Sequence, residues 1–194
     1  MIDHALDFLQ RQLNTYLRMK LDPADNSDFI LLANIARLGE GEQGNGGNGN
    51  AGDQNAFLGL VNIEEDRISK SQENYVKKDN SIVYKNPKVF LNLYILFAVN
   101  LSVYTEALKR LSFIIQFFQY RNVFDAVNSP TLNPGIERLI VDMYSMNFEQ
   151  ANQLWATMGG RYLPSVLYKV RLVGIEEEAI DAESSFIKSI SINN

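Results

Sequence analysis

Residues 86–100 read Asn-Pro-Lys-Val-Phe-Leu-Asn-Leu-Tyr-Ile-Leu-Phe-Ala-Val-Asn, and this stretch decides the fold of the chain. Pro87 restricts Asn86 to extended geometry, which marks the start of a strand. Val89 to Val99 is almost continuously apolar, a pattern typical of a strand that is covered on both faces. We therefore predict a long, buried strand over residues 88–99, with a helical pattern directly after it.

Amphipathic helices are predicted on either side of this strand. In residues 2–20, apolar residues recur at alternating steps of four and three, whereas polar residues such as Asn14 fall off the apolar stripe. After the strand, Ser102 is predicted to be the N-cap of a second helix that runs to about Tyr120. The apolar stripe of this second helix is wide, so we expect it to pack on a sheet.

Shorter apolar or alternating segments predict the remaining strands, at residues 29–36, 57–63, 82–84, 139–144 and 166–173. Residues 122–134 are predicted to be a turn-rich connection, because they contain two prolines and several asparagines. Strand neighbours come early in the chain and crossover helices come later. We therefore predict an α+β fold, in which helices pack against a mainly antiparallel or mixed sheet.

Residues 39–55 form a low-complexity insert that contains seven of the 12 glycines of the chain. Such a segment buries too little apolar surface to offset its ordering entropy, so we predict a mobile loop. Because strands are predicted on both sides of it, the insert is interpreted as the tip of a hairpin. Extra length at such a tip adds little to the cost of loop closure.

A short third helix is predicted from Asn147, as its cap, through Trp155, with Gly159-Gly160 ending it. Trp155 is the only tryptophan and lies beside two other apolar residues in this helical context. It is interpreted as a core residue or, alternatively, as an interface anchor.

The chain divides into a domain over residues 1–178 and a C-terminal arm over residues 179–194. The end of the arm alternates like a strand and places Phe186, Ile190 and Ile192 on one face, although Lys188 interrupts that face. The arm is either disordered or adds as a strand to a neighbouring subunit. In the second case these three apolar residues are candidate subunit or sheath contacts.

Composition and charge argue against two classes of partner. The formal net charge is −5, and no block of lysine or arginine gives the electrostatic footprint of a nucleic-acid-binding protein. The longest apolar run is well short of the roughly 20 residues that a membrane helix needs, so no membrane insertion is expected. Cysteine is absent, which excludes disulfides and agrees with synthesis in a reducing cytoplasm.

No catalytic, cofactor or metal site is predicted. His4 is the only histidine, and it lies in the first turn of a predicted helix without a nucleophile motif. Residues 44–49 match G-x-G-x-x-G but lack the following helix that gives this motif its meaning. The carboxylate runs at 64–66 and 176–178 are interpreted as solvated strand ends or, alternatively, as complements to a basic face of a partner.

Four segments carry a resemblance to a known family. They are Leu-Val-Asn-Ile-Glu-Glu-Asp-Arg at 60–67, Lys-Asn-Pro-Lys-Val-Phe-Leu-Asn-Leu-Tyr at 85–94, Asn-Phe-Glu-Gln at 147–150 and Gly-Gly-Arg-Tyr-Leu-Pro-Ser-Val-Leu-Tyr-Lys-Val-Arg at 159–171. In these segments the chain resembles the N-terminal domain of tail-terminator (cap) proteins of phage-tail-like contractile injection systems. The resemblance extends from about residue 3 to residue 176.

This resemblance implies a structural ring of six subunits at the distal end of an inner tube and an outer sheath. Such a ring stops polymerisation and joins the last sheath layer to the tube, so the implied partners are other copies of the chain, the tube protein and the sheath protein. It implies assembly in the bacterial cytoplasm, as a component of the injection particle. No catalytic residues come with this family. Trp155, Arg161 and Tyr162 are further candidate subunit or sheath contacts.

Two alternative functions remain open at this point. The first is an adaptor or baseplate-side ring of the same apparatus. The second belongs to a different class, a soluble ligand-binding or enzymatic α+β domain that uses a cleft beside the long strand. The lack of a convergent group of histidine, cysteine, aspartate or lysine residues in the sequence argues against this second alternative.

Overall fold

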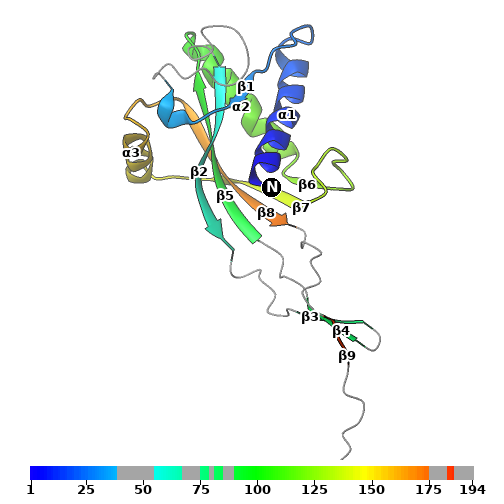
Figure 1. The fold of residues 1–194 in the computed structure, drawn as a ribbon. Coiled ribbons are helices and arrows are strands. Elements are labelled where there is room, and N and C mark those ends of the chain that lie inside the picture. Colours follow the sequence, from blue (N-terminus) through cyan, green and yellow to red (C-terminus); the bar gives the residue numbers. More distant parts are fainter. Residues whose placement is uncertain (39–54, 67–74, 79–80, 85–89, 175–182, 186–194) are drawn as a thin grey trace, which may run out of the picture.

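The computed structural model describes residues 1–38, 55–66, 75–78, 81–84, 90–174 and 183–185 (Figure 1). The elements in chain order are α1 Ile2–Leu21, β1 Ile30–Leu32, the 3-10 helix η1 Ile35–Arg37, β2 Asn55–Glu65, β3 Tyr75–Lys78, β4 Ser81–Tyr84, β5 Phe90–Asn100, α2 Tyr104–Tyr120, β6 Val123–Asp125, β7 Ile136–Tyr144, α3 Phe148–Thr157, β8 Ser165–Gly174 and β9 Glu183–Ser185.

Six strands form the main sheet, in the order β1-β2-β5-β8-β7-β6. All neighbours in it are antiparallel except β1 and β2, which are parallel. A second sheet has three strands in the order β3-β4-β9. The α+β prediction with a mixed sheet is therefore confirmed. The arm residues Glu183–Ser185 pair with β4 of their own chain, outside the main sheet.

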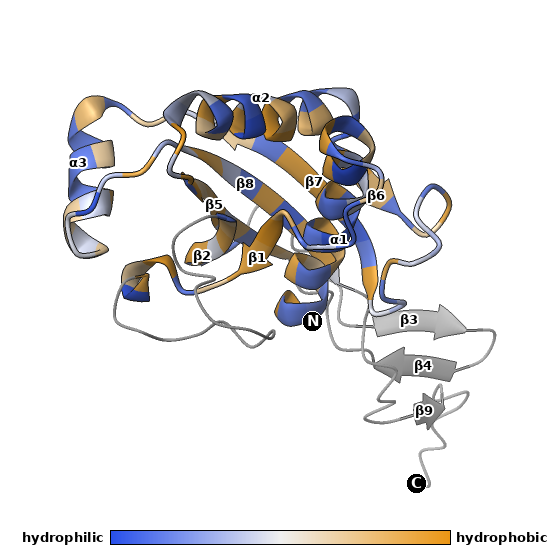
Figure 2. Ribbon diagram, turned by 90° about the horizontal axis from the view of Figure 1, so that it is seen from above, coloured by the Kyte–Doolittle hydropathy of each residue, from blue (hydrophilic) through white to orange (hydrophobic). Residues whose placement is uncertain are grey.

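The main core lies between α1, α2 and one face of the sheet, which we call the helix face (Figure 2). Phe97 of β5 is fully buried there, and its ring centroid lies 5.7 Å from that of Phe118 and 5.8 Å from that of Tyr168. Burial raises the pKa of the Tyr168 hydroxyl to about 12. Aromatic side chains thus join β5, α2 and β8 across the layer boundary.

A smaller core covers part of the opposite face of the sheet, which we call the second face. It brings Phe57, Leu96 and Leu167 together with Ile35 of η1 and Trp155 of α3. Since neighbouring residues of a strand point to opposite faces, β5 supplies both cores, with Phe97 in the main core and Leu96 in the smaller one. The predicted cover on both faces is confirmed for this part of β5, while residues 88 and 89 lie outside the described residues.

A glycine allows η1 to approach the sheet. A Cβ atom added at Gly59 of β2 would lie 2.8 Å from Cδ1 of Ile35 and 3.1 Å from the carbonyl oxygen of Ala33. Carbon atoms do not approach so closely, so any other residue at position 59 displaces Ile35.

The interpretation of the insert as a hairpin tip is wrong, because β1 and β2 run parallel. Two parallel strands need a connection that returns to the start of the second strand, which a tight turn does not provide. The chain also leaves the sheet after Leu32 and forms η1, where Asn34 accepts a hydrogen bond from the amide of Ala36. This local bond competes with strand pairing and shortens the predicted strand at 29–36. Residues 39–54, predicted to be mobile, lie outside the described residues.

Two further predictions differ from the structure. Helix α2 begins at Tyr104 with Val103 as its N-cap and no side-chain cap bond, so the assignment of this role to Ser102 is wrong. The predicted connection at 122–134 contains β6, which pairs with β7. The third helix is confirmed, since Asn147 and Gln150 form a capping box.

Asn14 lies outside the apolar stripe of α1 but is buried. Its side chain forms hydrogen bonds with backbone groups on the outer edge of β1. Its amide donates to the carbonyl of Ile30 at 3.0 Å, and its side-chain oxygen accepts from the amide of Ile30 at 2.9 Å. The neighbouring residue Phe29 uses its carbonyl to pair with Ala56 of β2. The polar groups of Ile30 therefore point away from the sheet, and α1 takes the place of a further strand.

Replacing Asn14 with alanine is expected to lower the free energy of unfolding by about 2 kcal/mol, because the buried amide of Ile30 loses its acceptor. The carbonyl of Ile30 keeps Gln10 as a donor, at 2.9 Å. Urea unfolding followed by circular dichroism measures the change. The control Thr15→Ala removes an exposed hydroxyl from the same helix and should cost less than about 0.5 kcal/mol. Equal losses in both variants would contradict this role of Asn14.

Candidate interaction surfaces

The candidate contacts Trp155, Arg161 and Tyr162 lie near one another beside the second face. The ring centroids of Trp155 and Tyr162 are 5.6 Å apart in an edge-to-face arrangement. Trp155 is 5% exposed and Tyr162 is 69% exposed, while Arg161 is exposed. The indole N–H of Trp155 is buried and has no hydrogen-bond partner among the described residues. The other candidates, Phe186, Ile190 and Ile192, lie outside the described residues.

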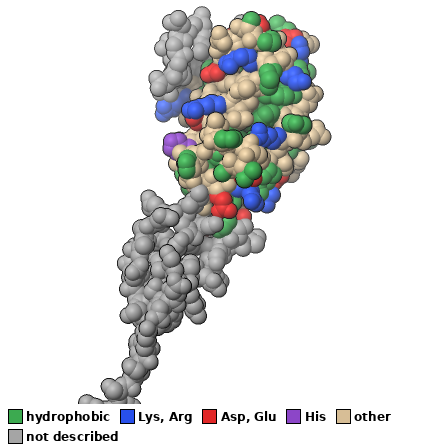
Figure 3. Space-filling view, turned by 90° about the vertical axis from the view of Figure 1, so that its right-hand side faces the viewer, with side chains coloured by type: hydrophobic (Ala, Val, Ile, Leu, Met, Phe, Trp, Pro, Cys, Tyr) green, Lys and Arg blue, Asp and Glu red, His purple; other side chains and the backbone are tan. Residues whose placement is uncertain are grey.

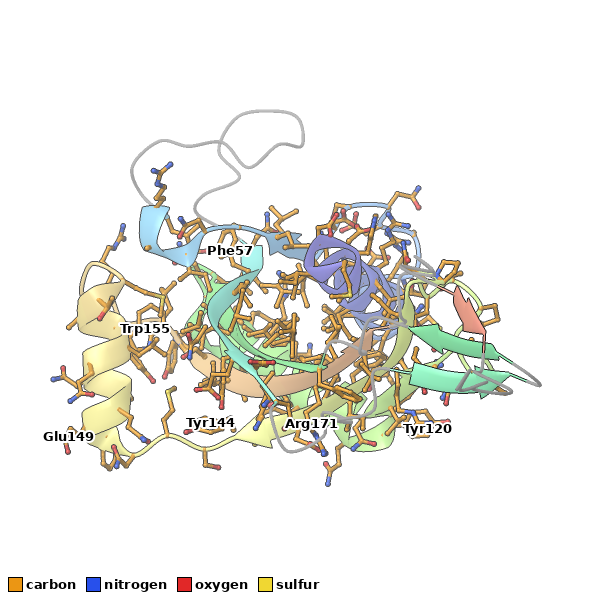
Figure 4. All side chains as sticks on the ribbon, turned by 60° about the horizontal axis from the view of Figure 1, so that its bottom comes forward. Phe57, Tyr120, Tyr144, Glu149, Trp155 and Arg171 are labelled. Atoms are coloured by element: carbon orange, nitrogen blue, oxygen red, sulfur yellow. The ribbon has the colours of Figure 1, made fainter. Side chains whose placement is uncertain are left out.

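Helix α3 holds this cluster in place through one buried side chain. Trp155 is the only buried residue of α3, and it lies on the side of the helix that faces the sheet, whereas Glu149 lies on the outer side (Figure 4). The helix ends at Thr157, and the φ angles of 92° and 77° at Gly159 and Gly160, which follow it, turn the chain back toward β8. The cluster therefore combines a core anchor with an exposed aromatic ring.

Phe148 is a further exposed aromatic residue, and it is not among the contacts predicted from the sequence. It is 97% exposed because it occupies the first position of α3, directly after the cap at Asn147. The sequence signal for this exposure is a large apolar residue at the first position of a helix, directly after the N-cap residue. Met143 and Tyr144, at the end of β7, are also exposed. The chain between β7 and α3 thus presents apolar side chains to the outside.

The part of the second face away from α3 is polar and has internally paired charges. The Tyr94 hydroxyl donates to the Glu64 carboxylate at 2.8 Å, and Arg171 pairs with Asp142 at 2.9 Å. Burial, together with the hydrogen bond and the charge of Glu64, raises the pKa of the Tyr94 hydroxyl to about 12. Glu64, interpreted as a solvated strand end, is thus exposed but bonded to β5. The charged side chains Glu64, Arg171 and Asp142 therefore have partners within the chain.

Other kinds of site find little support in the described ranges. No group of three or more histidine, cysteine, aspartate or glutamate side chains that could hold a metal occurs in residues 1–38, 55–66, 75–78, 81–84, 90–174 and 183–185. No helix in the part of the chain that the structure describes is long and apolar enough to cross a membrane. On the face drawn in Figure 3, basic and acidic side chains are interspersed with hydrophobic ones.

A third surface is the outer edge of β2. This strand covers Asn55–Glu65, but β1 pairs only with Ala56, Phe57 and Leu58. Beyond Leu58, no strand among the described residues pairs with that edge. Leu60 and Ile63 lie there and are 39% and 45% exposed. The sequence does not indicate this surface, because the position of a strand at the rim of a sheet depends on pairing between distant segments.

Comparison with known proteins identifies a matching family and solved structures with a similar fold. A family model described as the Pvc16 N-terminal domain matches residues 5–189. The chain resembles a solved sheath/tube terminator of the extracellular contractile injection system PVC in its extended state, with a TM-score of 0.55 and 14% identity over 95% of this chain and 62% of that one. It also resembles the tube terminating cap of the anti-feeding prophage, with a TM-score of 0.55 and 16% identity over 74% of this chain and 50% of that one.

At these identities the two solved structures establish the likeness in fold. The chain spans 62% and 50% of the lengths of these two proteins. None of the curated proteins matches the chain. The resemblance inferred from the four sequence segments is confirmed by the family match.

Proposed function

Since the chain belongs to the Pvc16 N-terminal domain family, we propose that it is a structural cap of a contractile injection system. In this role it ends polymerisation of the inner tube and the sheath and joins the last sheath layer to the tube. The observation that carries the proposal is the family match over residues 5–189, together with the fold shared with a sheath/tube terminator and a tube terminating cap.

The surfaces described above agree with such a role. Exposed apolar side chains occur at Phe148 and Tyr162, near the two ends of α3, and at Ile63 of β2, so the chain has separate surfaces that suit a subunit with several neighbours. We propose that these neighbours are other copies of the chain in a ring of six, the tube protein and the sheath protein. Binding, without catalysis, is the proposed activity. The protein assembles in the bacterial cytoplasm and becomes part of an extracellular particle.

Deletion of the gene tests this function. Without a cap, tube and sheath have no fixed stopping point, so electron micrographs should show a broad distribution of particle lengths or sheaths that contract spontaneously. Re-expression of the full chain should restore a narrow distribution. Particles of normal length and stability in the deletion strain would contradict the proposal.

A labelled chain then distinguishes the cap from the adaptor alternative. Gold label at the end of the particle opposite the baseplate is the expected result. Label at the baseplate end would instead support the adaptor or baseplate-side ring.

A further inference from the structure

The outer edge of β2 beyond Leu58 has no strand partner in the part of the chain that the structure describes. On its inner edge β2 pairs with β5 along its whole length, from Asn55 opposite Asn100 to Glu65 opposite Leu91. On the outer side β1 ends its pairing at Leu58. Unpaired strand edges offer backbone donors and acceptors in a row, which is the surface that strand addition uses.

The apolar side chains of this edge lie on the helix face. Leu60 stands opposite Ile95 and Ile63 stands opposite Leu93, and both of these β5 residues are fully buried in the main core. Leu60 and Ile63 are three positions apart, yet they share a face because the register shifts at Val61. The bulge therefore places two apolar side chains at the rim of the main core, where the single chain leaves them 39% and 45% exposed.

The negative charge at one end of the outer edge of β2 restricts which sequences can pair with it. After Ile63 the sequence continues with Glu64, Glu65 and Asp66, so this end of the strand is acidic. A matching strand needs apolar residues at alternate positions and a basic residue two positions from the last of them. Cross-strand pairs of this kind stabilise a sheet, whereas like charges opposite each other destabilise it.

We propose that residues 186–192 of a second copy of this chain pair with the open edge of β2. Their sequence is Phe-Ile-Lys-Ser-Ile-Ser-Ile, with apolar residues at alternate positions. In an antiparallel register that follows the bulge as β5 does, Ile192 lies opposite Leu60 and Ile190 lies opposite Ile63. Lys188 then lies opposite Glu65, at the acidic end. The lysine that interrupts the apolar face of the arm would thus face a side chain of opposite charge.

A second copy is the donor that the topology favours. The residues just before this segment, Glu183–Ser185, belong to β9 and pair with β4 in the separate three-stranded sheet of their own chain. If residues 186–192 pair with a neighbouring subunit, the contact joins two different surfaces and is therefore head-to-tail. Such contacts close into rings when the rotation per subunit permits. The inference deepens the proposed function and rests on its ring, because it identifies which strand and which segment join adjacent subunits.

Engineered disulfides test the pairing directly, since the chain contains no cysteine of its own. One full-length chain carries Ile63→Cys and a size tag, and a second, untagged chain carries Ile190→Cys. Opposite residues of a strand pair have Cβ atoms about 5 Å apart, within the range that a disulfide spans. After mixing and oxidation, gel electrophoresis should show a product with the mass of both chains, which a reducing agent removes.

The matched control moves one cysteine to the other face. Asn62→Cys points away from Ile63, so its mixture with the Ile190→Cys chain should yield little product. Equal yields at positions 62 and 63 would indicate random collision and overturn the proposal. So would no product at position 63, because the bulge and the acidic residues would then only protect the edge from pairing. A disulfide formed only within a chain that carries both Ile63→Cys and Ile190→Cys would place the segment on its own edge.

Substitutions without disulfides give a second readout. Ile190→Asp should shift the assembly toward monomers in mass measurements. Ser191→Asp is the control, because it lies on the opposite face of the segment and opposite the uncharged Asn62, and it should shift the assembly much less. Unchanged assembly of the Ile190→Asp chain would overturn the pairing. If the disulfide fails while the unmodified chain still forms rings and caps tubes, only the pairing is wrong. If the unmodified chain neither assembles nor caps tubes, the proposed function fails as well.

Discussion

Replacing Phe97 with alanine is expected to lower the free energy of unfolding by about 4 kcal/mol. Phe97 is fully buried at the centre of the sheet, and its ring contacts those of Phe118 and Tyr168. The truncation removes apolar contacts and leaves a cavity between β5, α2 and β8. Aromatic pairs of this geometry each add about 0.5–1.5 kcal/mol beyond the area they bury.

Chemical denaturation of the full chain measures this loss, provided that the slope against denaturant stays unchanged. Tyr120→Ala is the matched control, because Tyr120 is an aromatic residue at the end of α2 that is 89% exposed. Its truncation should change the free energy of unfolding by less than about 0.5 kcal/mol. A loss below about 1 kcal/mol for Phe97→Ala would contradict the central place of this ring in the core.

Trp155→Ala is expected to cost about 3 kcal/mol and to release α3 from the second face. Trp155 is the only buried residue of this helix and contacts the smaller core with Phe57 and Leu96. Limited proteolysis should therefore cut the variant near α3, while the main core stays protected. Phe148→Ala removes a 97% exposed ring from the same helix and should leave stability and proteolysis unchanged.

The indole N–H adds a sharper test. Because the indole N–H is buried and finds no hydrogen-bond partner in the described part of the chain, Trp155→Phe removes an unsatisfied donor along with part of the ring. The phenylalanine variant should lose less than about 1.5 kcal/mol, since the lost packing is offset by relief of the unsatisfied group. Equal losses for Trp155→Phe and Trp155→Ala would mean that the indole N–H has a partner in solution.

Local sequence patterns correctly predicted the helices and strands whose formation depends on residues close together in the sequence. The apolar run of β5, the stripes of α1 and α2, and the Asn147 cap of α3 all act within a few residues. These signals sufficed for the α+β class. They did not separate Trp155 as a core residue from Trp155 as an anchor. The structure shows its side chain buried within the single chain, and its role as a subunit or sheath contact stays a prediction.

Features that depend on distant pairing were missed or misread. The parallel pairing of β1 with β2 decides whether the insert is a hairpin, and nothing in either strand records its direction. Asn14 follows the polar pattern of α1, yet its function is set by Ile30, which lies 16 residues away. The effects of Gly59 and of the register shift at Val61 likewise depend on distant residues, because Ile35 packs against Gly59 and β5 pairs with β2. The candidate contact surfaces share this dependence.

The strand order has a consequence for how the protein is made. β8 is the last of the six strands of the main sheet to be synthesised, yet it lies between β5 and β7. While Ser165–Gly174 remains in the ribosomal exit tunnel, the nascent chain holds two separate groups of strands, each with an unpaired edge. Completion of the sheet therefore awaits the arrival of β8, and chaperones have a defined interval in which to protect those edges.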